Sequence, residues 1–226
     1  MGLATLAAVV VVALAGAGWF AGVIERVGAV ATGPCAGEPG LAWRVAVLEE
    51  AASGPAAVGV AAAALGGVLA WVVGPAPVLP ALLLLAGVGL VLAPVDVRTH
   101  RLPDAVVLPT YPALAILLAL AATREGLAPL ARAAEGGLVA FGVLYVLAFA
   151  LPAGLGYGDV KLAGLLGAVL AWYGWPVLLR GLVVGFLYGG VCAVVLLVTR
   201  RADRRSNLAY GPFLLAGTLT AVVLGA

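Results

Sequence analysis

The sequence predicts an all-α membrane protein, a polytopic bundle of about eight transmembrane helices (seven to eight). Hydrophobic residues make up 65% of the 226 residues and charged residues only 10%, with a mean hydropathy of +1.21. A soluble domain normally carries about 25% charged residues. The hydrophobic residues also form runs of roughly 20, the length of helix that crosses the hydrocarbon core of a bilayer. Because these runs are continuous rather than alternating, they favour helices over a β-barrel.

The apolar runs follow one another along the chain and define the expected spans. They lie at 3–24, 54–73, 77–94, 105–122, 136–153, 161–174, 177–199 and 208–225. The run at 161–174 is short, which leaves partial insertion open. The Pro- and Gly-rich stretch 74–80 predicts a tight connection between two spans. The longest polar segment, 25–53, is too short for an independent domain, so we expect one membrane domain over 1–226.

The basic residues predict the orientation, because positive residues in short loops stay on the cytoplasmic side. Placing the four arginines of 200–205 inside also puts the segments 25–53, 95–104 and 154–160, with the adjoining lysine, on that side. Nine of the twelve Lys and Arg are then cytoplasmic: Arg26, Arg44, Arg98, Arg101, Lys161, Arg200, Arg201, Arg204 and Arg205. We therefore expect a multi-pass protein of the inner (plasma) membrane with both termini outside.

The composition argues against several other classes of protein. The formal net charge is only +2 and the basic residues are scattered, so no nucleic-acid partner is expected. Cys35 and Cys192 are the two cysteines, too few for a four-cysteine zinc site, and we interpret both as buried or inert thiols. His100 is interpreted as a solvated loop residue, because a metal site needs further donors nearby. We expect no metal and no cofactor.

Three acidic residues stand next to apolar runs and are the candidates for chemistry. Asp96 follows one run directly, Asp104 begins the next, and Asp159 lies between two more. Ionisable groups close to hydrocarbon are costly and often functional. Capping of a helix N-terminus is the structural alternative, for Asp159 ahead of its helix and for Asp104 after Pro103.

The surroundings of these acids add two further observations. Gly156 and Gly158 immediately precede Asp159, and glycines let another helix or a substrate strand come close. Between Asp96 and Asp104, Arg98 and Arg101 are interpreted as topological anchors. Neither segment alone is specific for a function.

Together, the two segments resemble the prepilin peptidases, a family of membrane aspartyl proteases with a G-x-G-D motif. The family's pattern of an Asp that begins a short loop ending in Pro-Asp is matched by Asp96 and by Pro103 with Asp104. Its G-x-G-D-x-K-L-x-A pattern is matched by GYGDVKLAG at 156–164, where Gly164 is the loosely matched position.

Two further segments carry the same resemblance. YGPFLLAG at 210–217 is similar to the family's F-G-P-[FY]-L-x-x-G segment, and GWFAGVIERV at 18–27 is similar to its G-S-F-x-N-V-x-x-x-R start. The matches occur in the family's order and extend over nearly the whole chain.

The resemblance implies a membrane aspartic-type endopeptidase that cleaves the leader of type IV prepilin-like precursors after a Gly at the cytoplasmic face. Its substrates would be prepilins or pseudopilins with a basic leader and an apolar segment, and Asp96 and Asp159 would be the catalytic pair. Gly156, Gly158, Lys161, Pro103 and Asp104 would support the pair. Carboxyl groups held close cannot both ionise cheaply, so they share a proton. One carboxylate can then activate water while its protonated partner donates to the scissile carbonyl.

One departure from the family pattern concerns the cytoplasmic insertion. Bifunctional members carry two C-x-x-C pairs there and N-methylate the new N-terminus, whereas this chain has the short segment 25–53 with Cys35. A tetrathiolate zinc site cannot form. The chain thus resembles a peptidase-only or shortened member, and whether any N-methylation is retained stays open.

Two alternative functions stay open. A presenilin-type intramembrane protease would have a Tyr before the first aspartate and a Pro-Ala-Leu segment later, where this chain has Val95 and Gly211-Pro212-Phe213. A membrane transporter or scaffold would use the same acids to bind protons or ions. The identity of the precursor and the oligomeric state are open as well.

Overall fold

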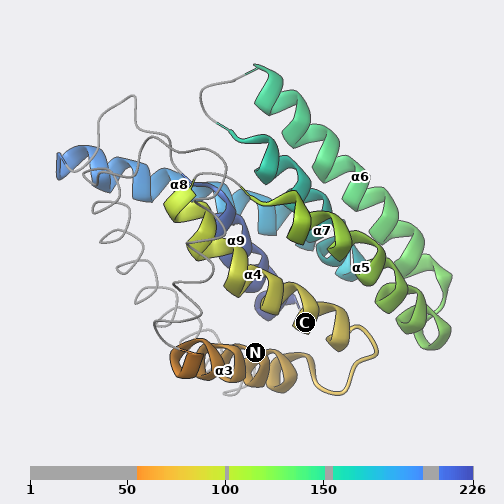
Figure 1. Ribbon diagram of the computed structural model, residues 1–226. Coiled ribbons are helices and arrows are strands. Elements are labelled where there is room, and N and C mark those ends of the chain that lie inside the picture. Colours follow the sequence, from red (N-terminus) through yellow and green to blue (C-terminus); the bar gives the residue numbers. More distant parts are fainter. Residues whose placement is uncertain (1–54, 100–101, 151–154, 201–208, 226) are drawn as a thin grey trace.

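The computed structural model describes residues 55–99, 102–150, 155–200 and 209–225. Within these ranges the chain forms helices and no strand, as predicted (Figure 1). The helices are α3 (Pro55–Val73), α4 (Leu79–Thr99), α5 (Asp104–Glu125), α6 (Leu127–Ala150), α7 (Tyr157–Tyr173), α8 (Trp175–Val198) and α9 (Gly211–Gly225). Figure 1 shows α4, α5 and α6 with their axes roughly aligned and the chain direction reversing from each helix to the next, and α3 lying across one end of the bundle.

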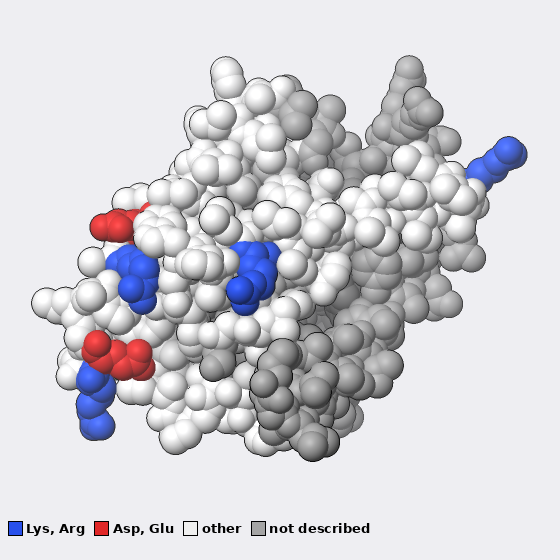
Figure 2. Space-filling model, turned by 180° about the vertical axis from the view of Figure 1, so that it is seen from behind, with Lys and Arg blue, Asp and Glu red and all other residues white. Residues whose placement is uncertain are grey.

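Each described helix overlaps one of the expected spans from residue 54 onward. Four are long and apolar enough to cross a membrane: Leu79–Val97, Asp104–Glu125, Leu127–Ala150 and Trp175–Val198. Figure 2 shows that charged side chains are few on the described part of one face and gather mainly toward one edge. The prediction of a membrane helix bundle is confirmed. The number of spans stays a prediction, because the run 3–24, like the segment 25–53, lies outside the described residues.

The largest error in the expected boundaries concerns α6, which begins at Leu127 rather than at 136. Two charged residues, Arg132 and Glu135, shorten the apolar run but do not end the helix. The Arg132 guanidinium donates to the backbone carbonyls of Ala171, at 2.7 Å, and Trp172, at 2.5 Å. These carbonyls belong to the last turn of α7, where the regular helical hydrogen bonds end; the Ala171 carbonyl also accepts from the Gly174 N–H at 3.0 Å. The charged Arg132 side chain therefore joins α6 to α7.

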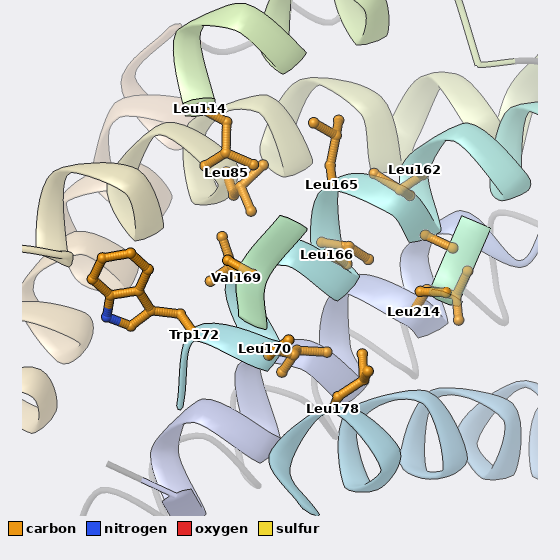
Figure 3. Close-up of a cluster of buried hydrophobic side chains, with 14 of the residues drawn as sticks. Leu85, Leu114, Leu162, Leu165, Leu166, Val169, Leu170, Trp172, Leu178 and Leu214 are labelled. Carbon is orange, nitrogen blue, oxygen red and sulfur yellow. The ribbon is translucent and has the colours of Figure 1, made fainter. Parts of the chain in front are cut away.

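Helix α7 is the centre of the bundle. Twelve of its 17 residues are buried, and it packs against α4, α5, α6, α8 and α9. A helix that is apolar on every side is expected to be enclosed by others. In Figure 3, Leu85 and Leu114 meet on one side of α7, while Leu178 lies on the other. The side chains of α7 are thus held in place by neighbouring helices on several sides.

Glycines allow the closest approaches between helices, as is common in membranes. On α6 and α7, a Cβ at Gly136 would overlap Ala171, and a Cβ at Gly167 would overlap Ala140. On α9, a Cβ at Gly217 would overlap the backbone of Gly185 on α8. The α6–α7 and α8–α9 pairs are therefore tightly packed units that flank the candidate site.

Candidate active site

Asp96 and Asp159 lie together at one end of the bundle. Asp96 is in the final turns of α4 and Asp159 is in the first turn of α7, and the two residues are only 4% and 5% exposed. The loop expected to begin at Asp96 is therefore shorter than predicted, because α4 continues to Thr99. The structure brings together the two carboxyl groups that the motifs had selected.

Gly211, the first residue of α9, lies between the two carboxyl groups. Its N–H donates to Asp96 Oδ2 at 3.0 Å. A Cβ on Gly211 would lie 2.7 Å from Asp96 Oδ2 and 3.5 Å from Asp159 Oδ1. The two oxygens cannot be farther apart than these two distances together, roughly 6 Å. A side chain at position 211 would occupy the space between them, so glycine is required for this arrangement.

The two oxygens of Asp159 have different surroundings. Oδ2 accepts a hydrogen bond of 3.3 Å from the N–H of Gly156, the N-cap residue of α7. Asp159 is thus the third residue of α7 rather than a residue ahead of the helix, and its carboxylate caps the helix N-terminus by accepting from the N-cap backbone. Oδ1 is buried and has no hydrogen-bond partner among the described residues. A buried polar atom without a partner is unusual and calls for an explanation. Here the atom lies on the Gly211 side, where a shared proton or a reacting group can bind.

Gly158 and Pro103 shape the approach of α7 to the segment before α5. A Cβ on Gly158 would lie 2.8 Å from Leu102 Cβ and 3.2 Å from its backbone nitrogen. Real side chains do not approach so closely, so this contact needs glycine. Pro103 is the N-cap of α5 in an extended conformation, with φ −69° and ψ 124°. These residues bring the beginnings of α5 and α7 side by side.

Asp104 and Lys161 form an ion pair between these two helix ends. Lys161 Nζ lies 2.6 Å from Asp104 Oδ1, with the side chains 32% and 56% exposed. The N-capping alternative for Asp104 is wrong, because α5 begins at Asp104 itself and its N-cap has no side-chain hydrogen bond. The pair joins α5 to α7 beside the two aspartates. An exposed pair of this kind contributes at most about 1 kcal/mol.

Two residues of the site were not selected from the sequence. Gly211 belongs to a segment that matches the family pattern, and a Gly-Pro step at the start of an apolar run indicates the beginning of a helix. No residue near Gly211 in the sequence indicates that it contacts Asp96. Tyr111 of α5 donates its hydroxyl to the Lys161 carbonyl at 2.6 Å. A tyrosine within an apolar run gives no signal of such a contact. Among the other candidates, Cys192 is a buried free thiol on α8, while His100 and Cys35 lie outside the described residues.

The arrangement is suited to acid–base chemistry. Two buried carboxyl groups this close cannot both carry a charge without a large cost, because burial and mutual repulsion both oppose the second charge. The pair can therefore hold one proton. The protonated carboxyl group can donate it to an atom of a substrate bond, and the ionised carboxylate can accept a proton from water. The Gly211 N–H is a fixed donor that stabilises the negative charge on Asp96.

Comparison with known proteins agrees with this geometry. The profile of the type IV leader peptidase family matches residues 82–198. The chain is 32% identical to a prepilin leader peptidase/N-methyltransferase of Pseudomonas aeruginosa over 174 residues, 74% of this chain and 57% of the relative. It is also 32% identical to one from Stutzerimonas stutzeri, over 71% of this chain and 55% of the relative. An Escherichia coli relative of the same name is 35% identical over 58% of this chain and 56% of the relative.

The chain thus spans little more than half the length of these relatives. No solved structure matches it. The family match covers half of the chain and includes both aspartates, all of α7, α4 from residue 82 onward and the ion pair beside the aspartates. This protein is a membrane protein, and it belongs to the type IV leader peptidase family.

Proposed function

We propose that this protein is an aspartic-type endopeptidase that removes the leader of type IV prepilin-like precursors, cleaving after a Gly, with Asp96 and Asp159 as its catalytic pair. The observation that supports it most is the meeting of two buried carboxyl groups around Gly211. Relatives named prepilin leader peptidase/N-methyltransferase support the substrate class. Gly156, Gly158, Pro103, Asp104 and Lys161 are proposed to support the pair.

The proposed mechanism uses the proton that the pair holds. The ionised carboxylate takes a proton from water as the water oxygen attacks the scissile carbonyl carbon, and the protonated carboxyl donates to the carbonyl oxygen. Breakdown of the tetrahedral intermediate returns a proton to the leaving amine and restores the one-proton pair. The buried position of both groups strengthens these interactions, because little water competes for them.

The proposed topology has about eight spans in one membrane domain over 1–226, with 25–53 as a short cytoplasmic segment. The active site would face the cytoplasm from the inner membrane. The ends of helices that carry Asp96, Asp104 and Asp159 lie together, and this is the side to which the basic residues were assigned. A precursor with a basic leader and an inserted apolar segment would present its junction at the same level of the bilayer.

We also propose that this chain cleaves without N-methylating its product. Two cysteines cannot supply the four thiolates of a zinc site of the kind found in the bifunctional members. The mass of the new N-terminus, with and without S-adenosylmethionine, tests this directly. A methylated product made by the purified chain would reject it.

The main test is processing of a tagged precursor in proteoliposomes, followed by N-terminal sequencing of the product. Asp96→Asn and Asp159→Asn should each abolish leader removal, while Glu135→Gln, an exposed acid on α6, should retain it. Processing that survives in either aspartate variant would reject the catalytic pair. A cut inside the apolar segment would indicate a presenilin-type protease, and Asp159-dependent solute uptake without processing would indicate a transporter.

A further inference from the structure

We propose that Tyr111 is a positioning residue for catalysis, and that it acts only because residue 164 is a glycine. Its hydroxyl, on α5, would set the place of the first turns of α7 and thereby the distance from Asp159 to Asp96. The inference rests on the proposed function, because it assigns a catalytic role to Asp159.

The first observation is a hydrogen bond from a side chain to a helix backbone. Tyr111 Oη donates to the carbonyl oxygen of Lys161 at 2.6 Å. Lys161 is two residues after Asp159, within the same turn of α7. A helical carbonyl has a second lone pair in addition to the one used within the helix, so it can accept this bond without losing its own. The bond therefore ties the Asp159 turn to α5.

The second observation is the space in which the hydroxyl lies. A Cβ on Gly164 would overlap the Tyr111 hydroxyl and would lie 3.4 Å from the ring carbon that bears it. Gly164 is buried in the contact between the helices. The hydroxyl reaches the backbone of α7 because this glycine has no side chain. Tyr111 and Gly164 thus form an interlocked pair, and a change in either displaces the other.

The third observation is that this bond is better shielded than the ion pair that also joins α5 to the Asp159 turn. The side chains of that pair, Lys161 and Asp104, are 32% and 56% exposed. Salt and water weaken an exposed ion pair. Tyr111 is only partly exposed and its bond is partly buried. We therefore assign to the hydroxyl the larger share in holding Asp159 on the α5 side, opposite the Gly211 contact.

The test is a double-mutant cycle on precursor cleavage in proteoliposomes. Tyr111→Phe should lower kcat on the order of 10-fold with KM nearly unchanged, because a small displacement of a reacting group reduces the rate but not binding of the substrate. Gly164→Ala should lower kcat at least as much, because the added methyl group displaces the hydroxyl. The double variant should be no slower than the slower single variant, since phenylalanine has no hydroxyl to overlap the new methyl group.

Tyr188→Phe is the matched control. Its hydroxyl lies 3.2 Å from Thr220 Oγ1 and joins α8 to α9. Loss of this bond removes a comparable contact between helices, so it should lower the temperature of thermal unfolding about as much as Tyr111→Phe does. It should leave kcat per folded molecule unchanged.

Three outcomes would overturn the inference: an unchanged kcat in Tyr111→Phe, losses that add in the double variant, or an equal loss of kcat in Tyr188→Phe. Processing that depends on Asp159 but not on Tyr111 would overturn it and leave the proposed function standing. If the wild-type chain processes no precursor, the proposed function fails and the inference fails with it.

Discussion

The two ends of α7 are held in different ways. At its C-terminal end, the Arg132 guanidinium satisfies the carbonyls of Ala171 and Trp172, and the Trp172 indole donates to Glu125 at 3.1 Å. At its N-terminal end, one oxygen of the buried Asp159 has no hydrogen-bond partner among the described residues, and a second carboxyl group lies close by. The first end is stabilised by these contacts, whereas the second keeps two buried carboxyl groups close together, an arrangement that the proposed catalytic role would explain. Substitutions at the two ends should therefore affect different measurements.

The largest effect is expected at the N-terminal end. Asp159→Asn and Asp96→Asn should lower the processing rate by roughly 10²–10⁴-fold, the range of acid–base contributions. Thermal unfolding should be unchanged or occur at higher temperature, because a neutral amide removes the cost of burying a charged carboxylate. Processing assays and thermal unfolding of the same purified variants measure both effects. A large loss of stability would mean that the pair holds the fold together, and the contrast between the two ends would fail.

Gly211→Ala should have the next largest effect on activity. Its methyl group would lie 2.7 Å from Asp96 Oδ2, so the carboxyl groups must move apart, and a displacement near 1 Å costs on the order of 10²-fold in rate. Gly142→Ala, where a Cβ meets nothing within 4 Å, is the matched control and should be fully active. Normal processing by Gly211→Ala would show that the two acids do not need this spacing.

At the C-terminal end, Arg132→Met should reduce stability rather than activity. The change leaves the Trp172 carbonyl without its charged donor and the Ala171 carbonyl with only the Gly174 N–H, which costs roughly 1–3 kcal/mol in the free energy of unfolding. Denaturation in detergent measures the cost, with Arg124→Met, an exposed arginine of α5, as the control. The kcat per folded molecule should change little. A specific loss of kcat in Arg132→Met would show that the two ends are coupled along the helix.

The smallest effect is expected for the exposed ion pair. Lys161→Met and Asp104→Asn should each lower processing only a few-fold, and the difference from wild type should shrink at high salt, because exposed pairs are weak and screened. A double-mutant cycle at low and at high salt measures this coupling. Complete loss of activity in Lys161→Met at both salt concentrations would instead assign the lysine a direct part in the reaction.

The sequence predicted the helices better than the contacts between them. Hydropathy located the described spans because each residue contributes to it independently. It failed at the start of α6 because Arg132, which lowers the hydropathy there, binds the backbone of α7. The motifs selected Asp96 and Asp159, which the structure brings together. Gly211 and Tyr111 could not be selected, since their roles depend on atoms from other helices.

Gly164 illustrates the same limit. It occupies the position where the chain matches the family pattern only loosely, and the sequence gives no reason for the difference. In the structure, the absence of a side chain at this position admits the Tyr111 hydroxyl. A loosely matched position can thus be the place where a member of a family has its own internal contact.

The glycine contact between α6 and α7 affects positions well beyond it. Gly167 is about two turns from Asp159, roughly 12 Å along the axis at 1.5 Å per residue. A packed helix shifts as a rod rather than deforming locally, so an extra methyl group deep in the bundle would move the carboxyl group at its tip. A random search for variants that no longer release the leader should therefore recover substitutions in the middle of the membrane, far from any residue that meets the substrate.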